Sequence, residues 1–153
     1  MSHRTVKAGW LRFGMNLWPP YRATGIRVKR IAPDYREAVV ELSTSWHNRN
    51  YIGTHFGGSL YAMTDPFYML MLIHVLGPEY FVTHKGGAIE YLLATREKVS
   101  AHFRLDDATI ADIKIRTAGG EKYLPQFAVE VKTAAGEVVA RVVHTLYIRK
   151  KRA

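Results

Sequence analysis

The sequence contains no cysteine among its 153 residues. This absence excludes disulfides, thiolate metal sites and a cysteine nucleophile, and it fits a reducing compartment. Acidic side chains are also scarce, since 13 Asp and Glu stand against 22 Lys and Arg, giving a formal net charge of +9. A phosphate-bearing ligand, a nucleic acid or simply a solvated basic surface fits this charge.

Internal repeats, low-complexity linkers and long apolar runs are missing as well. The most apolar stretch, residues 67–76, is shorter than a bilayer requires and contains His74. The N-terminus shows no charged segment followed by an apolar run and a cleavage site. We therefore expect a cytoplasmic protein without a membrane span. We expect one domain over residues 1–153, with a helical N-terminal segment (1–20) and a basic tail (149–153).

The spacing of apolar residues predicts an α+β fold with an antiparallel sheet of about six strands. Residues 6–17 have the apolar content of an amphipathic helix, which Pro19 and Pro20 are expected to end. In residues 37–42, Ala38, Val40 and Leu42 share one face, as in a half-buried strand. The predicted strands are 26–31, 37–42, 89–93, 98–104, 126–132 and 137–148.

Two helices are predicted within this sheet pattern. From Gly58 to about residue 75 the chain is apolar nearly all round at helical spacing, which indicates a buried central helix. Asp106 and Asp107 are candidates for the cap or the first turn of a short second helix, and Gly119-Gly120 is its expected end. A curved sheet needs one such element to cover its apolar face.

The stretch around the start of the central helix combines an amide, a glycine pair and an acid. Asn50 is followed by Gly53, by Gly57-Gly58 and, at the fifteenth position beyond it, by Asp65. Glycines at a helix entry allow close approach of a ligand, and first-turn N–H groups have no helical partner and can face an oxyanion. An acid within a buried helix requires a raised pKa or a polar partner.

Pro66 follows this acid and predicts a kink, because proline cannot donate to the carbonyl of Ala62. Such a kink would expose the Ala62 carbonyl in the pocket and tilt Asp65 toward an interface, or move Asp65 out of catalytic register.

The spacing from Asn50 to Asp65 resembles that of the hotdog-fold acyl-CoA thioesterases of the phenylacetyl-CoA type. The resemblance implies a sheet wrapped around a long helix, and a homodimer or dimer of dimers with the site at the subunit interface. It further implies that one subunit supplies the acid and the other the oxyanion-hole glycine. One departure is clear, since the family has histidine directly before Gly-Gly, where this chain has Phe56. The chain is more similar still to a bacterial hotdog family that lacks this histidine and has no settled function.

The resemblance implies hydrolysis of an acyl thioester of coenzyme A or acyl carrier protein, with no cofactor beyond the coenzyme A of the substrate. Gly57 would bind the oxyanion, Asp65 would act as general base or nucleophile, and Asn50 would orient water or substrate. Supporting candidates are Gly58, His55, and Thr83 or His84. The predicted pocket for an aromatic or medium-to-long acyl group is lined by Phe56, Tyr61, Met63, Phe67 and Tyr68.

Other interpretations stay open. Each residue also has an ordinary structural explanation, as a turn, a helix entry, a buried interface acid or core packing. A non-catalytic acyl-CoA or lipid-binding hotdog protein is the main alternative, followed by a hotdog dehydratase using His55 and by a nucleic-acid-binding protein, which the scarcity of aromatics among the basic clusters disfavours. No metal site is predicted, because the remaining histidines lack ligand spacing; they are His47, His74, His102 and His144.

Overall fold

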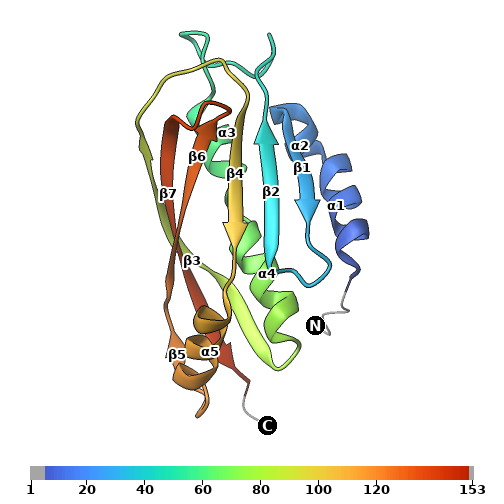
Figure 1. Ribbon diagram of the computed structural model, residues 1–153, viewed down its shortest axis with the longest axis vertical. Helices are drawn as coiled ribbons and strands as arrows, with labels where there is room; N and C mark the ends of the chain where they lie inside the picture. Colours follow the sequence, from blue (N-terminus) through green and yellow to red (C-terminus); the bar gives the residue numbers. More distant parts are fainter. Residues whose placement is uncertain (1–5, 152–153) are drawn as a thin grey trace.

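The computed structural model describes residues 6–151. Its elements in chain order are α1 (Ala8–Leu17), α2 (Pro19–Thr24), β1 (Ile26–Ile31), β2 (Glu37–Leu42), α3 (Gly57–Ala62), α4 (Phe67–Leu76), β3 (Tyr80–Tyr91), β4 (Val99–Arg104), α5 (Asp107–Arg116), β5 (Lys122–Tyr123), β6 (Gln126–Thr133) and β7 (Val138–Lys150). Figure 1 shows a curved sheet with α3 and α4 running along one side of it, and with α1 and α2 beside β1. The predicted α+β arrangement is confirmed.

The sheet has seven strands in the order β1-β2-β4-β6-β7-β3, and the two-residue β5 pairs with β7. Every pairing is antiparallel. Alternation along each strand decides which side chains enter the core. In β2 the side chains of Ala38, Val40 and Leu42 are buried, as the sequence predicts.

Aromatic rings fill the space between the central helix and the sheet. The ring of Phe103 on β4 lies 4.9 Å from that of Phe67 and 5.3 Å from that of Tyr68. Tyr68 also stacks on Phe127 of β6, with ring centroids 4.8 Å apart. Such pairs add about 0.5–1.5 kcal/mol each beyond the burial of their area. These aromatic contacts attach the α4 half of the central helix to β4 and β6.

Pro66 interrupts the central helix. α3 ends at Ala62, and Pro66 is the N-cap of α4. Proline has no N–H to donate, so it interrupts the helical hydrogen bonds. They resume with Leu70, whose N–H donates to Pro66 O at 2.9 Å. The predicted kink takes the form of a break, and the turn between α3 and α4 carries Asp65.

Tyr21 of α2 satisfies the carbonyl that this break leaves free. Its hydroxyl donates to Ala62 O at 3.2 Å, and the Tyr21 side chain is almost fully buried. The carbonyl therefore faces α2 and does not open into a pocket, which corrects one of the two outcomes expected for Pro66.

Replacing Tyr21 with phenylalanine is expected to lower the free energy of unfolding by about 1–3 kcal/mol, because a partly buried carbonyl loses its donor. Tyr35→Phe is the matched control, since the Tyr35 hydroxyl donates to Val6 O near the chain end, where water can replace it. Urea unfolding of both variants measures the difference. Equal losses would contradict a special role for the Tyr21 bond.

The segment after α1 differs from the prediction. Pro19 and Pro20 were expected to end the helical segment, but they are the first two residues of α2. Proline is tolerated there because the first N–H groups of a helix lack helical partners. Trp18, in an extended conformation, separates the two helices. Gly25, with a φ of 79°, ends the second one.

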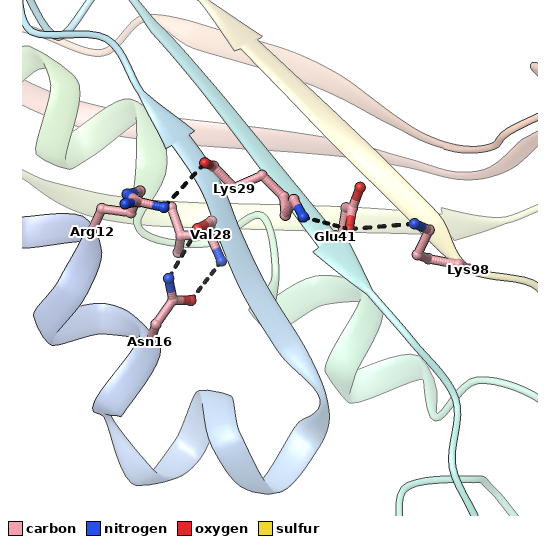
Figure 2. Close-up of polar contacts among 6 residues, drawn as sticks. All are labelled: Arg12, Asn16, Val28, Lys29, Glu41 and Lys98. Atoms are coloured by element: carbon pink, nitrogen blue, oxygen red, sulfur yellow. Dashed lines mark hydrogen bonds and ion pairs between the residues drawn. The ribbon is translucent and has the colours of Figure 1, made fainter. Parts of the chain in front are cut away.

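Polar side chains of α1 attach it to the edge strand β1 (Figure 2). The carboxamide of Asn16 accepts from Val28 N at 2.8 Å and donates to Val28 O at 3.0 Å. Arg12 donates to Lys29 O at 3.5 Å. Because an edge strand presents unpaired main-chain groups, these bonds both satisfy β1 and determine how α1 is rotated.

β3 is longer than predicted, with twelve residues where the sequence indicated only 89–93. Its pairing with β7 shifts register between His84 and Gly86, which leaves Lys85 as a β-bulge. Gly87 lies under the Tyr61 side chain, where an added Cβ would come within 2.2 Å of the tyrosine hydroxyl. The two glycines are thus part of a bent strand and do not end it.

The predicted basic tail is also corrected, because β7 continues through Lys150. Arg149 and Lys150 pair with Phe81 and Tyr80 of β3. Arg152, the last cation of this run, lies outside the described residues.

By length and composition alone, the combined stretch Gly57–Leu76 is long and apolar enough to cross a membrane. It exceeds the 67–76 run considered in the sequence. Half of its most apolar window is buried inside the fold, as in the core helix of a folded domain.

Candidate functional site

Asp65 lies in the turn between α3 and α4. Its N–H donates to Tyr61 O at 3.1 Å, and its side chain is 47% exposed. The sequence predicted an acid buried inside the helix; the break at Pro66 instead brings the carboxylate to a partly open position. The predicted polar partners are present, because charged and polar side chains from β3, β7 and α3 surround this turn.

His84 of β3 is one of these neighbours. Its Nδ1 lies 3.9 Å from Asp65 Oδ1, beyond the length of a direct hydrogen bond. Alternation along β3 places Thr83 on the opposite face of the strand. Of the two supporting candidates that the sequence left open, the structure therefore brings His84 to Asp65. The bulge at Lys85 immediately follows it, a feature that often re-aims side chains at sites.

His144 of β7 is a second neighbour, which the sequence analysis treated as structural. It is fully buried, and its ring centroid lies 5.3 Å from that of His84. Its Nε2 lies 3.0 Å from Thr64 Oγ1, while that hydroxyl donates to Tyr61 O at 2.8 Å. Because the hydroxyl proton is used there, we assign the proton of His144 to Nε2, leaving a lone pair on Nδ1.

Two ring nitrogens in this cluster have unused hydrogen-bonding capacity. His84 Nε2 and His144 Nδ1 are buried and have no hydrogen-bond partner among the described residues. Buried polar atoms are nearly always satisfied, so this pair points to an occupant that the protein atoms do not supply.

Burial, reinforced by the nearby His84, lowers the pKa of His144 from 6.5 to about 4, although Asp65 acts in the opposite direction. His144 is therefore neutral at pH 7. Burial and the Asp65 charge also raise the pKa values of Tyr61 and Tyr21. Both hydroxyls stay protonated near the carboxylate; the Tyr21 proton is used in the bond to Ala62 O.

The shift of His144 predicts a loss of stability on acidification. Between pH 6.5 and about 4 the unfolded chain binds a proton at His144 that the folded chain does not, so the free energy of unfolding falls as pH falls through this window. The contribution is roughly 2 kcal/mol after allowance for solvent screening. Urea unfolding at about pH 7 and about pH 4.5 should show a smaller acid loss for His144→Gln than for wild type. Equal losses would contradict the assignment.

The spacing of the cluster indicates what fits between its members. Asp65, His84 and His144 each offer one atom within 4.8 Å of the others, a composition that also suits a metal ion. Two ligands of a tetrahedral zinc ion lie about 3.3 Å apart. Two partners of one water molecule lie about 4.5 Å apart, given hydrogen bonds of about 2.8 Å. The 3.9 Å between Asp65 Oδ1 and His84 Nδ1 lies between these two values, so the cluster has room for a metal ion or for a water molecule.

The glycine pair opens a separate cleft of about 490 Å³. Phe56, in an extended conformation, is the N-cap of α3, and no side chain caps this helix. Neither Gly57 N nor Gly58 N donates a backbone bond within the described residues. An added Cβ would meet the Tyr91 hydroxyl at Gly57 and the Phe56 ring at Gly58. Gly57 and Gly58 thus line a cleft whose walls include the side chains of Phe56 and Tyr91.

Asn50 and His55 hold the loop that forms this cleft. The Asn50 amide donates to Thr54 Oγ1 at 2.9 Å and to His55 O at 3.0 Å, and its oxygen accepts from Thr54 N. Both amide protons are used, so Asn50 orients the loop in this structure. His55 is buried, and its Nε2 donates to Glu97 O at 2.7 Å. His55 lines the cleft as well, with its Nε2 engaged in this bond.

The structure corrects most of the predicted acyl pocket. Phe56 lines the cleft, and Tyr61 lies beside His144, with ring centroids 5.4 Å apart. Met63, Phe67 and Tyr68 are buried in the core against the sheet. The cleft is instead lined by residues of the loop ahead of α3 and of the chain that follows β3, which include Ile52, Tyr91, Leu92 and Leu93.

One copy of the chain does not bring Asp65 to Gly57. Eight residues separate them along the helical segment, which corresponds to roughly 12 Å. Asp65 is absent from the lining of the cleft that contains Gly57. The acid cluster and the glycine cleft are thus two half-sites.

Comparisons with known proteins agree with this fold. The family described as "Domain of unknown function (DUF4442)" matches residues 7–148. Among curated proteins, no sequence match was found. A crystal structure from Pseudomonas aeruginosa, described as a protein of unknown function and probable thioesterase, has a TM-score of 0.82 at 16% identity, covering 98% of this chain and 100% of that one.

Two further solved structures are similar. A thioesterase from Haemophilus influenzae has a TM-score of 0.68 at 13% identity, covering 96% of this chain and 93% of that one. The zebrafish thioesterase superfamily member 2 has a TM-score of 0.65 at 18% identity, covering 93% and 98%. At these identities the likeness establishes the fold, which is that of the hotdog thioesterases.

Proposed function

The chain belongs to the DUF4442 family, and from its hotdog fold and its candidate site we propose that it hydrolyses an acyl thioester. The observation that carries the proposal is the Asp65, His84 and His144 cluster, whose spacing suits a single water molecule. The cluster offers a carboxylate to take a proton and two histidines, each with a ring nitrogen that has no hydrogen-bond partner among the described residues, which could hold that water. These are the requirements of general-base hydrolysis.

In the proposed reaction, the thioester carbonyl lies against the N–H of Gly57, which stabilises the oxyanion of the tetrahedral intermediate. α3 has only six residues, so the bare N–H groups contribute more than a helix dipole. Water attacks the carbonyl carbon as Asp65 takes its proton. The C–S bond then breaks, and the proton passes to the departing thiolate, leaving a free acid and a thiol.

Asp65 as general base fits the geometry better than Asp65 as nucleophile. The carboxylate lies beside two histidines, each of which has one buried ring nitrogen without a hydrogen-bond partner among the described residues, and we propose that the attacking water is held among these groups. A nucleophilic carboxylate forms an anhydride and needs no such water at the first step.

The two half-sites support a homodimer in which Asp65 of one subunit meets Gly57 of the other. In one copy roughly 12 Å separates the two residues. The carbonyl and the water that attacks it must lie about 3 Å apart, so Gly57 and Asp65 of the same copy cannot serve both groups. An antiparallel pairing of two copies can bring the start of α3 in one copy beside the α3–α4 turn of the other, and a closed twofold dimer supplies such a pairing.

The proposed substrate is an aromatic or medium-to-long acyl thioester of coenzyme A or acyl carrier protein. The apolar side chains Ile52, Phe56, Leu92 and Leu93 at the glycine cleft support an apolar acyl group. The net charge of +9 supports a phosphate-bearing carrier.

Steady-state thiol release from a panel of acyl-CoA esters tests the proposal. The expected result is turnover of thioesters with apolar acyl groups by the wild-type protein.

A second candidate function, non-catalytic binding of acyl-CoA, is favoured by Phe56 in place of the family histidine. Binding of a non-hydrolysable acyl-CoA analogue without turnover of any ester would establish that second function and reject the first.

A further inference from the structure

Helix α1 has two apolar faces, of which only one is covered. Ala8 and Met15 are buried against the fold, and Leu11 packs against the core beside them. Trp10, Phe13 and Leu17 are more than half exposed, with Trp10 at 68%. At 100° per residue these three lie within an arc of about 60°, on the side away from the buried stripe. We call Trp10, Phe13, Leu17 and the adjoining Trp18 the outer face.

The outer face cannot turn inward. The two hydrogen bonds between the Asn16 carboxamide and Val28 attach α1 to β1 in one rotation (Figure 2). Rotating the helix to bury Trp10 would break both bonds and expose Met15. A large apolar surface is thus presented outward as a fixed feature of the fold, and patches of this kind mark interaction sites.

The charges on the segment that carries the outer face have one sign. No Asp or Glu occurs before Asp34. Lys29 and Arg30 have acidic partners, Glu41 at 3.8 Å and Glu37 at 3.6 Å. Four other cations have no ion pair within residues 6–151, and they are Lys7, Arg12, Arg22 and Arg27. All four are exposed.

We propose that the outer face of α1 docks onto the surface of a membrane that contains anionic phospholipid. Trp, Phe and Leu on one face of a helix, with cations flanking them, are the features of helices that lie in the interfacial region of a bilayer. Trp is favoured at the headgroup level, and each nearby cation is attracted to an anionic surface.

Charge favours this occupant over a second copy of the chain. In a twofold contact through α1, the unpaired Lys7, Arg12 and Arg22 of both copies would lie close together with no acid from residues 6–33 to compensate them. An anionic membrane supplies the missing charge.

Vesicle co-flotation tests the proposal with the full chain. Wild type is expected to bind vesicles of phosphatidylcholine with ~30 mol% phosphatidylglycerol at about 0.1 M salt, more weakly at higher salt, and not to bind phosphatidylcholine alone. The double variant Trp10→Ala/Phe13→Ala should lose binding at least tenfold. Arg12→Gln should weaken it about fivefold.

Ile115→Ala is the matched control, because Ile115 is 74% exposed on α5, far from α1 in the fold (Figure 1). It should bind as wild type does. The circular dichroism of the variants should be unchanged, since the replaced rings contribute little to the core.

Two results would overturn the proposal. One is the absence of wild-type binding to the anionic vesicles. The other is a change in oligomeric state of Trp10→Ala/Phe13→Ala with vesicle binding intact, which would identify the outer face as a contact between subunits.

Discussion

Replacing Asp65 with asparagine is expected to lower kcat for thioester hydrolysis about 10³-fold, because asparagine cannot accept the proton of the attacking water. The change is nearly isosteric, and Asp65 is 47% exposed, so the fold should be retained. KM should change little, since the amide keeps the shape of the site. Thiol release under saturating acyl-CoA measures the effect.

Asp34→Asn is the control for this substitution. Asp34 accepts from Arg36 N at 3.1 Å in an exposed turn away from the cluster, and asparagine can make the same bond. Its activity should equal that of wild type. If Asp65→Asn retained wild-type kcat, Asp65 would not be the base.

Replacing Gly57 with proline is expected to lower kcat about 10²–10³-fold by removing one N–H from the oxyanion site. Gly57 is the first residue of α3, a position where proline is tolerated. The preceding residue, Phe56, already has the extended backbone (φ −67°, ψ 125°) that a following proline requires. The substitution therefore removes the donor with little change in the main chain.

Gly57→Ala separates the donor from the added side chain. Alanine keeps the N–H but also places a Cβ 2.8 Å from the Tyr91 hydroxyl, which belongs to a half-exposed side chain that can move. Gly57→Ala should lose far less activity than Gly57→Pro. Equal losses in the two variants would show that packing against Tyr91, and not the N–H, is what matters at this position.

Much of the fold could be predicted because local pattern and tertiary structure agree. Alternation in residues 37–42 gave the burial of Val40, and the Asp106 cap of α5 was correct, since its carboxylate accepts from Thr109 N at 2.7 Å. The first part of β3 was missed because Gly86 and Gly87 interrupt its pattern. Gly87 is there to make room for Tyr61, a contact across elements that no local pattern reveals.

The candidate site likewise contains residues that a local motif predicts and one residue that only tertiary packing adds. Gly57 and Asp65 lie close together in the sequence, so their spacing can be recognised as a motif within one segment. His144 lies 80 residues beyond Thr64 and joins the cluster only through the packing of β7. One signal was available, because Val142, His144 and Leu146 alternate along the inward face of β7. A polar residue on a buried face indicates a partner or a function.

Mixed dimers test most directly the central claim that Asp65 and Gly57 of different subunits form one hydrolytic site. Asp65→Asn and Gly57→Pro, each inactive alone, would be unfolded together and refolded as a mixture. The account predicts recovery to about a quarter of wild-type activity, because half of the dimers are mixed and each mixed dimer has one intact site of two. No recovery, with mixed dimers shown to form, would contradict it.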